Sequence, residues 1–183
     1  MPDPVLVVGA TGILRPAVRS LVAAGRPVVA VARTAADLGA LRAELGPAVT
    51  PVAADHRDAE QLLRRLVAVC PRYSAALVYA PVASEATLAT LRLVTDGPVV
   101  ELLVSANAAP AEPADEGGAE PAFDLIMLTP HQSVPWRQLM LGWTAEGRWH
   151  SPEEISAAAL DVLDSGHDAL LGVVRPWASR PSH

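Results

Sequence analysis

Residues 5–14 read Val5-Leu6-Val7-Val8-Gly9-Ala10-Thr11-Gly12-Ile13-Leu14. An apolar run of strand length leads directly into a glycine-containing turn, and a helical pattern that ends near Ala24 follows. In such a turn, backbone N–H groups and the helix N-terminus face an anion such as a pyrophosphate. The stretch therefore predicts the strand-turn-helix unit of a dinucleotide-binding fold. The alternative is a tight turn that holds no ligand.

The pattern outward from this turn alternates short apolar runs with helical periodicity. This alternation is typical of βαβ units around a parallel sheet, whose strands are apolar on both faces. We expect an α/β fold of three layers, a Rossmann-type doubly wound and mainly parallel sheet. The expected strands are Val5 to Gly9, Val28 to Ala32, Val49 to Ala53, Ala75 to Ala80 and Val99 to Ser105, and the expected helices are Ile13 to Ala24, Ala35 to Leu45, Ala59 to Val69 and Glu85 to Val94.

The regular alternation stops after the fifth strand. Residues 106 to 122 are rich in Ala, Pro, Gly and acidic residues and predict an exposed, irregular loop. Ser151-Pro152-Glu153-Glu154 predicts a helix start, with Ser151 as N-cap and Glu154 in the capping-box position. The later strands are expected at Phe123 to Leu128, Gln138 to Trp143 and Leu170 to Val174. We expect residues 1 to 183 to form a single domain.

The composition excludes several classes of protein. A net charge of −6 argues against a nucleic-acid partner, and the apolar runs are too short for a membrane span. One cysteine cannot form an intramolecular disulfide, and the five histidines show no metal-ligand spacing. All 14 basic residues are arginine, so lysine chemistry is excluded. These features predict a cytoplasmic protein without a metal site.

The end of the second strand predicts which dinucleotide is bound. NAD sites commonly carry an acidic residue there, whereas this chain has Arg33-Thr34, and a guanidinium suits a 2′-phosphate. NADPH is therefore favoured over NADH. Arg15 replaces the third small residue of the fingerprint and either meets a cofactor phosphate or is solvated. Asp55 either reaches the adenine edge or caps the next helix. The expected cofactor contacts are Gly9, Thr11, Gly12, Ile13, Arg33, Thr34, Asp55, Tyr79 and Ala80.

Together these motifs resemble the short-chain dehydrogenase/reductase superfamily. The glycine turn, Ala32-Arg33 and Asp55 carry the likeness in the N-terminal half. Residues 136–143, 148–156 and 172–177 are similar to C-terminal segments of a group of small bacterial members. The resemblance covers most of the chain and is weakest between residues 106 and 135. It implies the fold and the cofactor pocket, and a homodimer is consistent with it.

The catalytic residues of the superfamily are matched only in part. Its typical enzymes use a serine after the fifth strand, which Ser105 matches, and a Tyr-x-x-x-Lys pair on the following helix. This chain has no lysine, and its tyrosines, Tyr73 and Tyr79, both precede that strand. Among the remaining groups, His131 has the best intrinsic pKa for a general acid, although an exposed loop histidine is the alternative. The expected catalytic residues are therefore Ser105 and His131.

Three functions agree with these observations. The first is an atypical NADPH-dependent oxidoreductase acting on a small imine, enone or carbonyl compound. The second is a redox-neutral enzyme, such as a cyclase or isomerase, on the same scaffold. The third is a non-catalytic protein that senses NADP(H). The four tryptophans lie in the C-terminal part, where they either form a substrate wall or pack in the core or a dimer interface.

Overall fold

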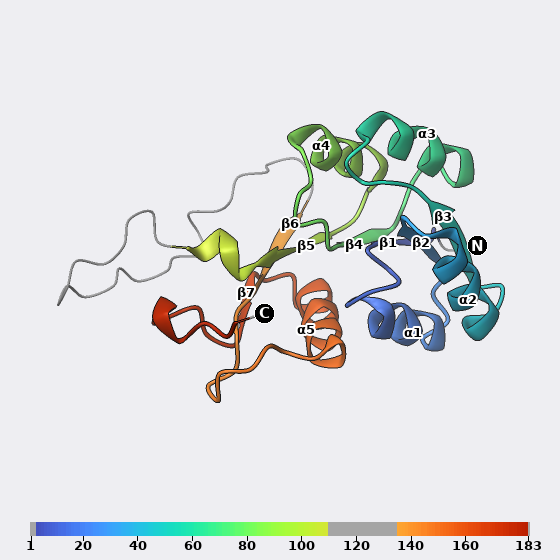
Figure 1. Ribbon diagram of the computed structural model, residues 1–183. Helices are drawn as coiled ribbons and strands as arrows, with labels where there is room; N and C mark the ends of the chain where they lie inside the picture. Colours follow the sequence, from blue (N-terminus) through green and yellow to red (C-terminus); the bar gives the residue numbers. More distant parts are fainter. Residues whose placement is uncertain (1–2, 110–134, 183) are drawn as a thin grey trace.

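A parallel sheet is the centre of the molecule (Figure 1). The computed structural model of the protein describes residues 3–109 and 135–182, and within them seven strands pair in the order β3-β2-β1-β4-β5-β6-β7. The strands are β1 (Val5–Val8), β2 (Val28–Ala32), β3 (Val49–Ala53), β4 (Ala75–Val78), β5 (Val99–Val104), β6 (Trp136–Leu141) and β7 (Ala169–Leu171). Every pair of neighbours is parallel, so the carboxyl ends of all the strands lie at one edge.

Helices cover both faces of this sheet. The helices are α1 (Arg15–Ala23), α2 (Ala35–Leu45), α3 (Ala59–Val69), α4 (Glu85–Val94) and α5 (Pro152–Ser165), with short 3-10 helices η1 (Ser105–Ala108) and η3 (Trp177–Ser179). In Figure 1, α1, α2 and α5 lie on one face, and α3 and α4 lie on the other. The expected three-layer Rossmann-type architecture is confirmed.

The core follows from the two-residue period of the strands. In β1, Val5 and Val7 pack with α1, α2 and α5, whereas Leu6 and Val8 pack with α3 and α4. All four side chains are buried, because helices cover both sides of the strand. A central strand of this kind fits the continuous apolar run in the sequence.

The capping box predicted before α5 is present. Ser151 Oγ accepts the backbone N–H of Glu154, and the Glu154 carboxylate accepts the backbone N–H of Ser151. The helix ends at Ser165, and its C-cap residue, Gly166, has the left-handed conformation with φ of 69°. In the described part of the chain, no helix has the length and apolar composition needed to cross a membrane.

The last two strands differ from the sequence-based expectation. β6 starts at Trp136 rather than Gln138 and stops at Leu141, because Gly142 passes so close to Val173 that a Cβ would lie 2.2 Å from its carbonyl oxygen. β7 stops at Leu171 rather than Val174, since Gly172 takes a φ of +81°. The expected strand at Phe123 to Leu128 lies outside the described residues, as do residues 110 to 122 of the expected loop. Its first residues, 106–108, belong to η1.

Candidate functional site

The glycine turn lies where the strand order reverses, with β2 on one side of β1 and β4 on the other. Gly9 has a φ of +85°, and a Cβ there would lie 2.9 Å from the carbonyl oxygen of Tyr79 at the end of β4. The N–H groups of Gly9 and Ala10 both donate to the carbonyl of Val31 in β2. The turn is therefore held tightly against both neighbouring strands, and its first position requires glycine.

The start of α1 is suited to an anion. Its N-cap residue, Leu14, makes no side-chain cap, and its first turn has no acidic residue. The partial positive charge of the helix N-terminus is therefore not neutralised by the helix itself. The sequence left Arg15 either to a cofactor phosphate or to solvent, and in the structure its guanidinium forms an ion pair with Glu44 on α2. Arg19 pairs with the same carboxylate at 2.6 Å, and these hydrogen bonds, first that of Arg15, hold the pKa of Glu44 below its usual range.

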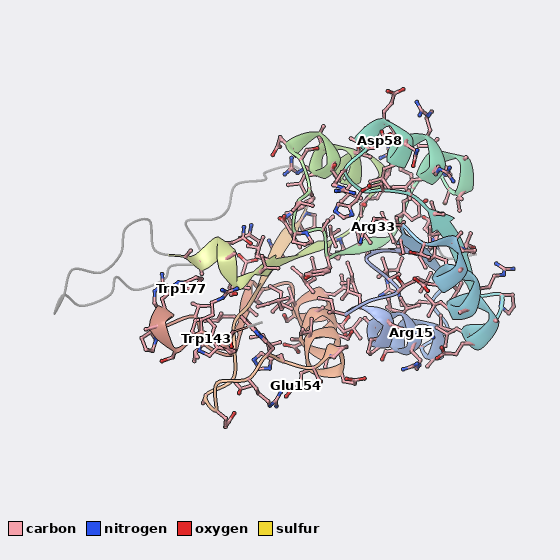
Figure 2. All side chains as sticks on the ribbon, viewed as in Figure 1. Arg15, Arg33, Asp58, Trp143, Glu154 and Trp177 are labelled. Atoms are coloured by element: carbon pink, nitrogen blue, oxygen red, sulfur yellow. The ribbon has the colours of Figure 1, made fainter. Side chains whose placement is uncertain are left out.

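A cavity of about 380 Å³ opens beside the glycine turn. The ends of the first four strands and the start of α2 form its walls. Its polar lining comes from Thr11, Arg33, Thr34, Asp37, His56, Arg57 and Tyr79. Figure 2 shows Arg33 over the N-terminal half of the sheet, between the two helix layers. Arg33 and Arg57 bring positive charge to the cavity, and Arg57 forms an ion pair with the neighbouring Asp55. The Arg33 guanidinium can bind an anionic ligand.

Asp55 lies next to this cavity, directly after β3. Its carboxylate accepts from the Arg57 guanidinium at 2.7 Å and from the Arg57 backbone N–H at 3.0 Å. These hydrogen bonds hold the pKa of Asp55 well below its usual range. The hypothesis that Asp55 caps the next helix is wrong, because Asp58 makes that cap by accepting from the backbone N–H of Gln61. Its contact with an adenine edge remains a prediction.

His56 contributes a neutral imidazole to the same cavity. Burial lowers its pKa, against the opposing effect of Asp55. Its backbone carbonyl accepts from Thr87 Oγ1 at 2.6 Å, which ties the segment to α4. Among the described residues, nothing forms a hydrogen bond with His56 Nε2, although this atom is buried. A buried nitrogen of this kind suits a ligand that can donate to it or accept from it.

A second cavity, also of about 380 Å³, lies beyond the end of β5. Its apolar walls come mainly from Ile13, Leu141 and Ile155, and its polar groups come from Ser105, His150 and Arg180. Tyr79 lines both cavities, so the two are neighbours across one side chain. Burial raises the pKa of Tyr79, which keeps its hydroxyl protonated.

Ser105 and Arg180 meet inside the second cavity. Arg180 Nε donates to Ser105 Oγ at 3.1 Å. The guanidinium carbon lies 5.2 Å from the ring of Trp149 and 5.3 Å from the ring of Trp177. His150 is nine-tenths buried nearby, and its Nδ1 lies 3.5 Å from Glu154 Oε2. The cavity thus combines a hydroxyl, a guanidinium and an imidazole.

The structure distributes the expected site residues between the two cavities. Gly9, Thr11, Gly12, Arg33, Thr34 and Tyr79 line the first, and Ile13 and Ser105 line the second. Ala80 follows Tyr79 and packs against the core. His131 lies outside the described residues. Within residues 3–109 and 135–182, no cluster of three side chains could hold a metal ion.

Sequence reasoning missed His150 and Arg180 as cavity residues. Both lie in the C-terminal part, where the tryptophans were the residues that suggested a substrate wall. Trp136 and Trp143 are core residues, exposed by only 2% and 1%, whereas Trp149 lines the second cavity. Figure 2 shows Trp143 and Trp177 together at this end of the molecule. A tryptophan cluster beside an arginine could have indicated a cation–π site, but no spacing rule identifies the partner.

Comparison with known proteins identifies the fold. No protein-family model and no curated protein sequence matches the chain. Among solved structures, a 3-oxoacyl-[acyl-carrier protein] reductase with bound NAD from Brucella melitensis is similar with a TM-score of 0.70 and 17% identity, over 93% of this chain and 89% of that one.

Two further solved structures are similar in fold. The RhlG/NADP active-site complex from Pseudomonas aeruginosa is similar with a TM-score of 0.66 and 14% identity, over 94% of this chain and 96% of that one. A short-chain dehydrogenase/reductase family oxidoreductase from Burkholderia thailandensis has a TM-score of 0.65 and 21% identity, over 94% and 91%. Together with the strand order, these likenesses confirm the resemblance at the level of the fold. The chain has the Rossmann-type α/β fold of the short-chain dehydrogenases/reductases.

Proposed function

We propose that this protein is an NADP(H)-dependent oxidoreductase that acts on a small imine, enone or carbonyl compound. The observation that carries the proposal is the pair of neighbouring cavities that share Tyr79. The first has a glycine turn and arginines suited to a dinucleotide, and the second has polar groups suited to a substrate. Ligands bind at this edge in open α/β sheets, beyond the carboxyl ends of the strands.

The residues of the first cavity fit a phosphorylated dinucleotide. The uncapped start of α1 suits the pyrophosphate, and the absence of a side chain at Gly9 allows the backbone to approach it. Arg33 follows β2 directly and is exposed, so its guanidinium can bind a 2′-phosphate. Arg57 lies on the same cavity wall and forms an ion pair with Asp55. These features favour NADP(H) over NAD(H).

The chemistry must differ from that of a Tyr-x-x-x-Lys enzyme. A bound nicotinamide cofactor would supply or accept a hydride at the second cavity. Ser105 can hydrogen-bond to the substrate there, and its hydroxyl is buried at the end of β5. The structure adds His150 to His131 as a candidate proton donor, because His150 lines this cavity. The fold neighbours include an oxidoreductase and a 3-oxoacyl-[acyl-carrier protein] reductase, which supports an oxidoreductase function.

Isothermal titration with NADPH and NADH tests the cofactor. We expect NADPH to bind more tightly, and Arg33→Asp to weaken NADPH binding by about 1 to 3 kcal/mol while sparing NADH. Arg15→Gln is the matched control, because Arg15 pairs with Glu44 and lies outside the cavity lining. Equal affinities for the two cofactors would contradict the NADP preference. If neither cofactor binds, the oxidoreductase proposal fails.

A further inference from the structure

Arg180 lies 75 residues after Ser105 in the chain, and its side chain donates a hydrogen bond to this serine at the carboxyl end of β5. We infer that Arg180 positions and polarises Ser105, and that this pair forms an oxyanion site which selects an α,β-unsaturated carbonyl substrate. The inference deepens the proposed oxidoreductase function and rests on it. The group that touches the substrate is Ser105, and Arg180 acts through it.

The guanidinium of Arg180 is held by aromatic rings. It lies over Trp149 and Trp177, and Trp143 packs edge-on against both, at centroid distances of 6.3 and 6.1 Å. Trp143 is fully buried, so the aromatic cluster is anchored in the core. The positive charge is therefore fixed in place before any substrate arrives. Such preorganisation makes a charge effective in stabilising a transition state.

The geometry leaves the Ser105 hydroxyl free to donate. A serine Oγ has one donor hydrogen and two acceptor lone pairs. Among the described residues, Arg180 is the one hydrogen-bond partner of Ser105 Oγ, and it uses a lone pair of that oxygen. A charge-assisted hydrogen bond to an oxygen makes its own O–H a stronger donor. Ser105 lines the cavity, so a substrate oxygen there can accept this hydrogen bond.

The fixed positive charge selects among the candidate substrates. A cationic iminium would be repelled by the guanidinium, whereas a substrate that gains negative charge would be stabilised. A simple ketone gains that charge as an alkoxide, which needs a strong proton donor such as the missing tyrosine. A conjugated carbonyl compound gains it as an enolate, which is much less basic. The apolar walls from Ile13, Leu141 and Trp149 suit the carbon skeleton of such a molecule.

The reduction of such a substrate needs no side chain that transfers a proton to the carbonyl oxygen. A bound reduced nicotinamide cofactor would supply a hydride, carrying two electrons, to the β-carbon of the substrate. The C=C electrons move toward the carbonyl, and the enolate oxygen accepts the Ser105 hydrogen bond. The α-carbon then takes a proton from water. One reduced cofactor and one proton are consumed for each saturated carbonyl product.

The first test uses 4-nitrophenol, whose phenolate is a planar mimic of an enolate and whose absorbance reports its ionisation. We expect the protein to bind the phenolate form, Arg180→Met to weaken this binding at least about tenfold, and Arg180→Lys to retain most of it. Arg65→Met, which removes an exposed arginine from α3, is the matched control. Unchanged phenolate binding by a folded Arg180→Met protein would overturn the inference.

The second test measures NADPH oxidation with 2-cyclohexenone and with a cyclic iminium. We expect turnover of the enone, a loss of about 10²-fold in kcat for Arg180→Met with little change in KM, and partial rescue by added guanidinium ion. Adding Ser105→Ala to the Arg180→Met protein should abolish the rescue by guanidinium ion, because Arg180 acts through Ser105. Turnover of the iminium but not of the enone would overturn the inference about Arg180 and Ser105 and leave the proposed oxidoreductase function standing. Phenolate binding without any binding of NADPH would overturn the proposed function alone.

Discussion

Ser156 on α5 donates a hydrogen bond of 2.8 Å from its Oγ to the backbone carbonyl of Ile13, 143 residues earlier in the chain. Ile13 belongs to the turn between β1 and α1, and it also lines the second cavity. Ser156 is buried, with 2% of its surface exposed. This hydrogen bond therefore links α5 to the glycine turn between β1 and α1.

Replacing Ser156 tests this link. Ser156→Ala leaves the Ile13 carbonyl without its partner, so we expect the free energy of unfolding to fall by about 1 kcal/mol. Ser20→Ala on the exposed face of α1 removes a serine that has no such contact and should change it by less than about 0.5 kcal/mol. Urea denaturation of both variants measures the difference. Equal effects of the two substitutions would show that the hydrogen bond contributes nothing.

Gly9 should tolerate no side chain. Its φ of +85° is unfavourable for other residues, and a Cβ would press on the Tyr79 carbonyl oxygen at 2.9 Å. We expect Gly9→Ala to lower the free energy of unfolding by about 2 to 3 kcal/mol and to weaken NADPH binding. Gly39→Ala, inside α2 with open space around it, should instead raise stability by about 0.5 to 1 kcal/mol. If the Gly9→Ala protein were as stable as the wild type, a Cβ at this position would cause no strain, contrary to the prediction.

Glu154 should make stability depend on pH. Its hydrogen bonds with Arg148 and then with the Ser151 backbone lower its pKa from 4.5 to about 2. Because the folded-state pKa is depressed, its stabilising effect is complete above the unfolded value and is lost as the pH falls through the folded value. Glu154→Gln keeps a capping-box acceptor and removes the charge.

Urea denaturation at several pH values measures the effect. The urea midpoint of Glu154→Gln should be lower than that of the wild type at neutral pH, and the two should converge as the pH falls from about 4.5 towards 2. Glu153→Gln changes an exposed carboxylate in the same turn and should have a smaller effect. A difference that is constant across this range would show that the charge of Glu154 is not responsible.

Most helices and strands could be predicted because their signals are local. The expected bounds of β2, α2, β3, α3 and α4 agree with the structure, since the apolar pattern of each element lies within its own segment. The ends of β6 and β7 could not be predicted. They depend on two close backbone contacts, that of Gly142 with Val173 and that of Gly172 with Trp143. The two residues of each contact are distant in the sequence.

The sequence by itself determined the class of fold, the glycine turn and the absence of a Tyr-x-x-x-Lys pair, because each depends on residue types at short spacing. Only the tertiary structure decided the partners of the charged and polar groups. It paired Arg15 with Glu44 and Arg180 with Ser105, which are distant in the sequence. The physical reason is that a long arginine side chain can reach many positions. Its partner is therefore selected by the packing of helices, strands and tail around it.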